Sequence, residues 1–123
     1  MTILVTGSNG ALGRILCQWL AEQSSEDLVS TSRLGGKDGV AQIACDVSDG
    51  RQVRDVIGRV RPRMIYHVAG CFTNDFERDY AVNALGAKHL ADALLQTRNG
   101  ARLVLFGSSA EYGEVAPEDN PIK

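Results

Sequence analysis

The sequence lacks the features that mark several large classes of protein. Its 123 residues hold 13 lysines and arginines against 15 aspartates and glutamates, with no basic run and no interleaved aromatic stripe. We therefore expect no nucleic-acid partner. No apolar run approaches the roughly 18 residues that cross a bilayer. The N-terminus enters an apolar segment at once, without a basic leader, so we expect no membrane association and no targeting segment.

Cysteine and histidine are also scarce, which bears on redox compartment and metal binding. Cys17, Cys45 and Cys71 lie within apolar patterns and form no Cys-x-x-Cys pair. They are typical of reduced, buried thiols in a cytoplasmic protein. His67 and His89 stand at no ligand spacing from a cysteine or a carboxylate pair, so we expect no metal site. His67 lies in an apolar segment and is interpreted as a core residue.

The composition that remains is that of a globular protein, with 44% hydrophobic residues and a net charge of -2. We expect one domain over residues 1–123. Apolar segments alternate with helical periodicities, which predicts an α/β fold with a doubly wound, Rossmann-type parallel sheet in three α/β/α layers, incomplete at about five strands. The expected strands are 2–5, 28–32, 40–44, 64–68 and 102–106, the last buried on both faces. The expected helices lie near 12–20, 53–60 and 77–96, and 107–123 is expected to be loop.

A glycine-rich segment, TGSNGALG, runs from Thr6 to Gly13 between the first strand and the first helix. Gly7 permits a tight turn, Gly10 removes a Cβ where backbone would approach a phosphate, and Gly13 lets the helix lie close to the strand. The spacing G-x-x-G-x-x-G departs from the commoner G-x-G-x-x-G. The segment could instead be an ordinary turn between a strand and a helix, without a bound phosphate. We prefer a pyrophosphate site, because the helix N-terminus favours an anion. The residues assigned to it are Gly7, Ser8, Asn9, Gly10, Ala11, Leu12 and Gly13.

Two helices carry further information in their apolar patterns. The first has apolar residues at offsets typical of an amphipathic helix, namely Leu12, Ile15, Leu16, Trp19 and Leu20. The long helix at 77–96 spreads apolar residues over more of its circumference than one covered face requires. Its second face could meet another copy of the chain in a homodimer. The equal alternative is that small alanines merely fill a helical surface.

Five motifs in order resemble the extended short-chain dehydrogenase/reductases that act on nucleotide sugars. The motifs are TGSNGALG, Cys45-Asp46-Val47, His67-Val68-Ala69-Gly70, Asn83-x-x-Gly86 and the segment GSSAEYG at 107–113. The resemblance covers essentially the whole chain. It implies the NAD(P)-binding, amino-terminal part of a longer oxidoreductase that transfers hydride at a sugar hydroxyl or keto carbon.

The resemblance also implies roles for residues at the carboxyl ends of the strands, where open α/β sheets bind ligands. Asp46 and the Val47 backbone would bind the adenine amino group, and Ala69 and Gly70 would line the path to the nicotinamide. Asp46 could instead cap the helix that follows. The resemblance also places Asn83 among the cofactor-binding residues. Asparagine is unfavourable within a helix, which suggests that its amide meets a backbone or water partner near the site. A packing role for Asn83 is equally open.

The end of the second strand bears on the choice of cofactor. An acidic residue there would bind the ribose 2′-hydroxyl, but the sequence has Ser32-Arg33. Arg33 offers a charge-assisted, bidentate contact to a 2′-phosphate, so NADP is preferred over NAD. Arg33 could instead be an exposed loop residue, and Arg14 could assist or replace it.

The segment GSSAEYG is similar to the serine-containing stretch of GDP-mannose 4,6-dehydratases and GDP-4-keto-6-deoxymannose reductases. In that pattern the Ser109 hydroxyl would bind the substrate oxygen that becomes, or ceases to be, a carbonyl. Glu111 takes the place of an acid/base carboxylate, and Ser108 would contact the cofactor. Without the resemblance, these residues are a polar strand end and a solvated acid.

One element of the family pattern is missing from the sequence. The family uses a tyrosine followed four residues later by a lysine that lowers its pKa. Here the residues that follow Tyr66, Tyr80 and Tyr112 at that spacing are Gly70, Ala84 and Ala116. Two interpretations therefore stay open. One is an epimerase, dehydratase or reductase of nucleotide sugars whose further residues lie outside this sequence, and the other is a non-catalytic dinucleotide-binding module.

Overall fold

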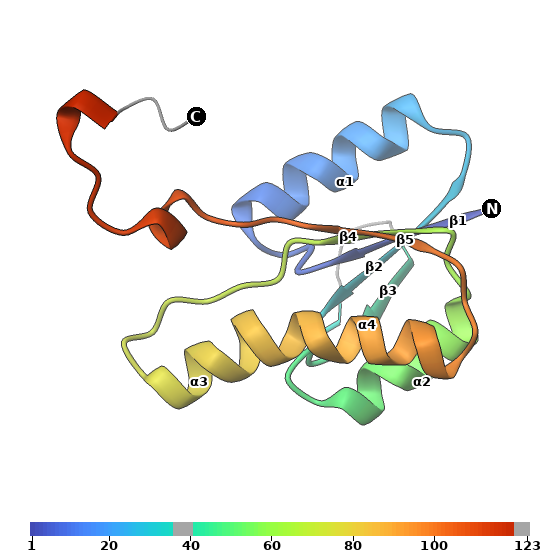
Figure 1. Ribbon diagram of the computed structural model, residues 1–123. Coiled ribbons are helices and arrows are strands. Elements are labelled where there is room, and N and C mark those ends of the chain that lie inside the picture. The colour runs from blue at the N-terminus through green and yellow to red at the C-terminus, as the bar shows by residue number, and fades with distance from the viewer. Residues whose placement is uncertain (36–40, 120–123) are drawn as a thin grey trace.

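The computed structural model describes residues 1–35 and 41–119 and contains a five-stranded sheet (Figure 1). All neighbouring strands are parallel, in the order β3-β2-β1-β4-β5. The strands are β1 (Thr2–Thr6), β2 (Asp27–Ser32), β3 (Ala41–Ala44), β4 (Met64–His67) and β5 (Arg102–Leu105). The Rossmann-type parallel sheet predicted from the sequence is confirmed. Val40 and most of the connection expected at 34–39 lie outside the described residues.

Helices on both faces of the sheet make the three predicted layers (Figure 1). α1 (Ala11–Gln23) lies on one face, whereas α2 (Gly50–Val60) and α4 (Gly86–Gln96) pack together on the other. Because every strand is parallel to its neighbours, the carboxyl ends of all the strands gather at one edge of the sheet. A ligand site built from the strand ends belongs at that edge.

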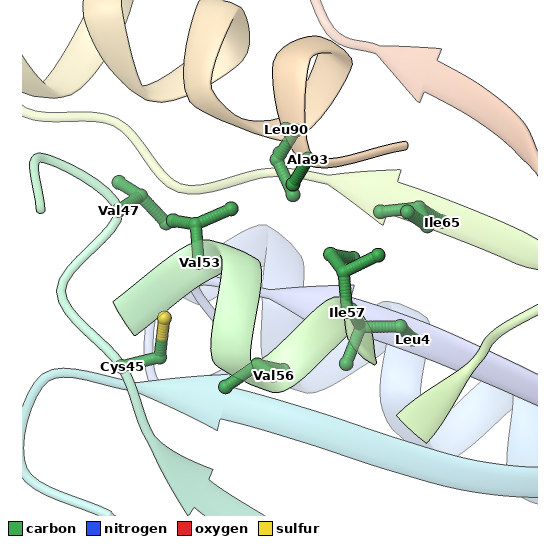
Figure 2. Packing of buried hydrophobic residues seen from close by; sticks show 9 residues of the cluster. All are labelled: Leu4, Cys45, Val47, Val53, Val56, Ile57, Ile65, Leu90 and Ala93. Atoms are coloured by element: carbon green, nitrogen blue, oxygen red, sulfur yellow. The ribbon is translucent and has the colours of Figure 1, made fainter. Parts of the chain in front are cut away.

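The larger hydrophobic core lies between the sheet and the layer of α2 and α4 (Figure 2). Leu4 of β1 and Ile65 of β4 pack there against Ile57 of α2 and Leu90 of α4. Each of these four side chains is at most 1% exposed. Burial of such a side chain stabilises a fold by about 1.5–3 kcal/mol relative to leaving it in water. The central strands β1 and β4 are therefore fixed firmly, and the loops at their ends start from rigid positions.

α1 meets the sheet through only part of the predicted apolar stripe, since Leu20 is buried and Leu16 packs against the same core cluster. Gly13, Cys17 and Leu20 are its buried residues. The apolar residues Leu12, Ile15 and Trp19 are instead exposed, at 49%, 68% and 55%. A Cβ at Gly13 would lie 2.2 Å from the carbonyl oxygen of Gly7. Gly13 therefore packs closely on the loop from the same helical face that buries Cys17 and Leu20.

The C-terminal part differs from expectation in two ways. β5 is an edge strand that pairs with β4 alone, and its end residues Arg102 and Leu105 are exposed. The expectation that this strand is buried on both faces is therefore wrong. The segment expected to be loop after 106 contains two short 3-10 helices, η2 (Ser109–Tyr112) and η3 (Pro117–Asp119). This segment leaves the sheet at the edge where the strands end and extends away from it (Figure 1).

The long helix expected at 77–96 is continuous but not uniform. It consists of α3 (Phe76–Tyr80), a π-helical turn η1 (Ala81–Leu85) and α4. π-helical turns are rare, and they often mark functional positions. Here the turn carries Asn83, whose side chain binds the backbone of Cys71 in the loop after β4. The wide turn therefore coincides with a tie between this helix and the end of a central strand.

Candidate functional site

A cleft of about 340 Å³ opens at the edge where β1 to β4 end. Its walls come from the glycine-rich loop, from the residues that follow β2, β3 and β4, and from α3 and η1. Nine residues predicted from the sequence line it, namely Gly7, Asn9, Gly10, Ser32, Arg33, Asp46, Val47, Ala69 and Gly70. The parallel sheet has brought together four segments that are far apart in the chain.

Two glycines of the loop are required by the fold itself. Gly7 has a φ of +73°, and a Cβ there would lie 2.5 Å from the Cα of Ala69. Gly13 has no room for a Cβ either, as the packing of α1 shows. The Thr31 carbonyl anchors the loop by accepting hydrogen bonds from the backbone N–H groups of Gly7 and Ser8, at 3.0 and 3.1 Å. Backbone packing between strand, loop and helix accounts for both glycines.

Gly10 has a different role, because the fold does not require a glycine there. Its φ is -72°, and a Cβ would meet only the Gly7 carbonyl oxygen, at 3.4 Å. Gly10 lines the cleft and is the N-cap residue of α1, with no side-chain cap. The first N–H groups of α1, at Ala11, Leu12 and Gly13, have no hydrogen-bond partner within the described ranges. Unpaired N–H groups and the helix dipole beside an open position favour a bound anion.

Asp46, at the end of β3, carries a fixed negative charge into the cleft. Its Oδ1 accepts hydrogen bonds from the Ser48 N–H and hydroxyl, at 2.9 and 2.7 Å. The Ser48 hydroxyl is the main reason that the pKa of Asp46 lies below its ordinary value, and the charges of Arg33 and Arg78 act in the same direction. α2 is capped by Asp49. The alternative in which Asp46 caps that helix is therefore wrong, and its carboxylate has acceptor capacity left for a ligand.

Two arginines from separate elements line the same cleft. Arg33 follows β2, and Arg78 lies on α3. Neither takes part in an ion pair with another residue that the structure describes. Ser32, beside Arg33, is buried and donates its hydroxyl to the Gly35 carbonyl oxygen at 3.0 Å. Its hydroxyl therefore closes the turn after β2, and the arginine side chain is the group that can reach a ligand.

The loop after β4 is held in place by the long helix. The Asn83 amide donates to the Cys71 carbonyl oxygen at 2.7 Å and accepts from the Cys71 N–H at 2.9 Å. Asp79 accepts hydrogen bonds from the N–H and hydroxyl of Thr73, at 2.9 and 2.8 Å, and from the Cys71 thiol at 3.3 Å. The predicted backbone partner of Asn83 is confirmed. Asn83 shapes the wall of the cleft, and it is not among the residues that line it.

The cysteines and His67 separate into core and cleft residues. Cys17 and Cys45 are buried as expected, and burial is the main cause that raises the pKa of the Cys45 thiol to about 11. Cys71 is only half-buried and lines the cleft, so the expectation of burial is wrong there. Burial, followed by the Asp79 carboxylate, raises the pKa of Cys71. His67 is 5% exposed and hydrogen-bonded to Thr6 at 2.7 Å, which confirms it as a core residue.

Several assigned residues lie away from the lining of the cleft. Ser8 is buried and donates its hydroxyl to the Thr31 carbonyl oxygen at 3.2 Å, so it supports the loop. Ser108 is exposed and accepts a hydrogen bond from the Ala110 N–H at 3.2 Å, which starts η2. The remaining assigned residues are Ala11, Leu12 and Gly13 in the first turn of α1, and Ser109 and Glu111 in η2.

Sequence reasoning did not find part of the cleft wall. The residues it missed as site residues are Leu34, Cys45, Val68, Cys71, Arg78 and Val82. Arg78 and Val82 are four residues apart on the long helix, a spacing that puts two side chains on one helical face. Their proximity to the strand ends depends on how the helix packs, which no local pattern reveals.

The described residues were also compared with the requirements of a metal site and of a membrane-spanning helix. Among residues 1–35 and 41–119, no cluster of three or more histidine, cysteine, aspartate or glutamate side chains could hold a metal ion. No helix in that part of the chain has both the length and the apolar character needed to cross a membrane.

A sequence profile of the NAD dependent epimerase/dehydratase family matches residues 3–123. Among curated proteins, the chain is 34% identical to polyketide synthase GfsA of Streptomyces halstedii, over 89% of this chain and 2% of that protein. It is 30% identical to the spore coat polysaccharide biosynthesis protein SpsK of Bacillus subtilis strain 168, over 98% of this chain and 41% of SpsK.

Solved structures show the same architecture. WbmG of Bordetella bronchiseptica, in complex with NAD, is 26% identical with a TM-score of 0.78, over 92% of this chain and 39% of that one. The dTDP-4-dehydrorhamnose reductase of Bacillus anthracis strain Ames, in complex with NADP, is 26% identical with a TM-score of 0.68, over 83% of this chain and 34% of that one. The chain thus spans about two fifths or less of each of these relatives.

Proposed function

The chain belongs to the NAD-dependent epimerase/dehydratase family, and from that membership we propose that its cleft binds a nicotinamide dinucleotide for hydride transfer at a sugar carbon. The observation that carries the proposal is Gly10. It is a glycine that the fold does not need, it faces the cleft, and it stands beside unpaired N–H groups of α1. A pyrophosphate fits this donor set, because it needs close backbone approach, N–H donors and a favourable dipole.

The remaining residues of the cleft fit the adenosine end of such a ligand. The Asp46 carboxylate keeps free lone pairs and would accept from the adenine amino group. Ala69 and Gly70 offer a wall without long side chains, along which the ligand would pass from β1 toward β4. When bound, the dinucleotide supplies the hydride chemistry, and this chain supplies binding and orientation. Relatives solved with NAD and with NADP support this class of cofactor.

We propose NADP as the preferred cofactor, because Arg33 is free of ion pairs with other described residues. Replacing Arg33 with serine is expected to weaken NADPH binding by at least about tenfold, the loss typical of one charge-assisted contact. NADH binding should stay within about twofold, since NADH has no 2′-phosphate for the arginine to meet. Isothermal titration of both dinucleotides checks this, with Arg59→Ser as the matched exposed control.

Either of two results would reject the assignment of Arg33 to the 2′-phosphate. If Arg33→Ser weakens NADH as much as NADPH, the residue supports the site in general and does not select the phosphate. If neither affinity changes, Arg33 is the exposed loop residue of the alternative interpretation.

For the substrate we propose a nucleotide sugar. The polysaccharide-biosynthesis relative SpsK and the dTDP-4-dehydrorhamnose reductase support that class. The specific hypothesis, GDP-4-keto-6-deoxymannose or GDP-mannose, rests on GSSAEYG alone. In that hypothesis Ser109 would hydrogen-bond the reacting oxygen and Glu111 would exchange a proton.

These residues form one cofactor-binding domain in the proposal, and the chain supplies no Tyr-x-x-x-Lys pair for proton transfer. A second candidate function is a dinucleotide-binding module without catalysis of its own. Both candidates require the same cleft and the same cofactor. They differ only in whether further residues complete the chemistry.

We also propose that the outer face of the long helix pairs with a second copy. Phe76 and Leu95 are 74% and 77% exposed, and Tyr80 is 48% exposed and stacks on Phe76 at a centroid distance of 5.8 Å. In an antiparallel pairing about a two-fold axis near residue 85, Phe76 would meet Leu95, and Tyr80 would meet the small Ala91. Symmetric dimers need such a self-complementary patch.

Replacing Tyr80 with glutamate is expected to abolish this association, because the pairing would place a charge in an apolar contact. Sedimentation at tens of micromolar should show a dimer for the wild type and a monomer for the variant, with Gln18→Glu on α1 as the control. A wild-type monomer at that concentration would contradict the pairing.

A further inference from the structure

We propose that Arg78 is a second specificity-determining cation of the cleft, which acts with Arg33 on the 2′-phosphate of NADPH. The inference rests on the proposed function, since it concerns the same cofactor. No sequence pattern marks Arg78, which lies in a helix far along the chain from the second strand. The fold places it in the same cleft as Arg33.

The position of Arg78 follows from how α3 is anchored. The Asp75 side chain caps α3 by accepting from the Arg78 N–H at 3.3 Å, and Asp79 ties the helix to the loop after β4. The backbone on both sides of Arg78 is therefore fixed against the cleft wall. Val82, one turn further along, lines the same cleft, so this face of the helix is turned toward it. The Arg78 guanidinium is consequently held near the cleft without an acidic partner among the described residues.

Arg33 and Arg78 influence the pKa values of the same two side chains of the cleft, Asp46 and Cys71. Arg33 and Arg78 both contribute to lowering the pKa of Asp46, after the hydrogen bond from Ser48. They also both oppose the rise in the pKa of Cys71 that burial and Asp79 cause. Asp46 and Cys71 line the same cleft after different strands, so the charges of both guanidinium groups reach side chains on two segments of its lining. A ligand anion bound in this cleft would lie in the field of both charges.

The charge balance of the cleft shows what the second arginine adds. The charged residues among its described lining are Arg33, Asp46 and Arg78. Arg33 at +1 and Asp46 at -1 sum to zero, so this pair alone would give a 2′-phosphate little net attraction. Adding Arg78 makes the sum +1. Because a phosphomonoester carries a charge of about -1.5 to -2 at neutral pH, the second arginine restores a preference that the aspartate would otherwise cancel.

The chemistry of arginine suits this role better than that of lysine would. A guanidinium is always charged and presents planar donors that match phosphate oxygens in a bidentate contact. Two such groups from separate elements could satisfy several oxygens of one phosphate. Arg78→Lys would keep the positive charge and lose the bidentate donor geometry, so it should retain part of the preference for NADPH over NADH.

The test is a set of calorimetric titrations of the whole chain with NADPH, NADH, 2′,5′-ADP and AMP. Arg78→Ala is expected to weaken NADPH and 2′,5′-ADP by at least about tenfold, as for one charged hydrogen-bonded contact. NADH and AMP should stay within about twofold. Arg78→Lys should fall between the wild type and Arg78→Ala, and Arg59→Ala, an arginine on the outer end of α2, should behave as the wild type. Thermal unfolding of each variant checks that the fold is retained.

The results separate failure of this inference from failure of the proposed function. If the wild type prefers NADPH and Arg78→Ala leaves that preference unchanged, the assignment of Arg78 is overturned and the proposed function stands. An equal loss of affinity for all four ligands also overturns it. The arginine would then either stack on the adenine that all four share or maintain the shape of the cleft. A wild type that binds neither dinucleotide overturns the proposed function and this inference with it.

Discussion

Replacing Gly13 with alanine is expected to lower the free energy of unfolding by about 3 kcal/mol or more, the upper range for inserting a group into a packed site. The added Cβ would lie 2.2 Å from the Gly7 carbonyl oxygen and 2.8 Å from the Ser8 Cα. Both neighbours are backbone atoms, so relief requires α1 to move away from β1. Urea unfolding, followed by far-UV circular dichroism, measures the change.

Gly100→Ala is the matched control for Gly13→Ala. No atom lies within 4 Å of a Cβ added at Gly100, so its effect on stability should stay below about 1 kcal/mol. Equal unfolding midpoints for the two variants would show that α1 does not depend on close packing at Gly13.

Gly10→Ala is expected to have the opposite effect to Gly13→Ala: the fold should be retained, and binding of the cofactor should be weakened. The negative φ of Gly10 suits alanine, and the Cβ would meet only one atom, at 3.4 Å. The free energy of unfolding should therefore fall by only about 1 kcal/mol, the typical loss for alanine at an N-cap position. The methyl group would stand where a pyrophosphate approaches the N–H groups of α1, so NADPH and NADH should both bind at least about tenfold more weakly.

Calorimetric titration and urea unfolding of the same Gly10→Ala sample separate the two effects. Wild-type affinity in this variant would show that no phosphate approaches the backbone at Gly10. A large loss of stability would show instead that the fold, and not a ligand, requires glycine at this position.

The fold and the glycine-rich loop could be predicted from the sequence because their signals are local. Short apolar segments alternate with helical periodicities, and steric demands of a strand–turn–helix junction explain Gly7 and Gly13 without reference to distant residues. The ends of β2, β3 and β4 then follow from parallel topology, which places Arg33, Asp46 and Ala69 at one edge of the sheet.

The orientation of α1 and the environment of β5 could not be predicted in the same way. Apolar periodicity shows that a helix has a hydrophobic stripe, but it does not show which part of that stripe meets the sheet: Leu20 is buried, whereas Trp19 is exposed. For β5, an apolar segment predicts a strand, whereas its exposure depends on whether a neighbour lies beside it.

Arg78 and Cys71 are residues of the cleft that the sequence could not predict as site residues. Arg78 lies on α3 and Cys71 lies in the loop after β4, and side chains of the long helix, Asp79 and Asn83, hold that loop through hydrogen bonds to Cys71. These ties connect side chains to backbone groups across several residues and carry no repeating pattern. A site residue that depends on such ties becomes visible only when the helix is placed against the sheet.

The central claim is that the cleft at the strand ends binds a nicotinamide dinucleotide and prefers the phosphorylated form. A calorimetric titration of the wild-type chain with NADPH and with NADH, under the same buffer and salt, tests it most directly. We expect one site per chain and at least about tenfold tighter binding of NADPH, equivalent to about 1.4 kcal/mol. Binding of neither dinucleotide, or tighter binding of NADH, would contradict it.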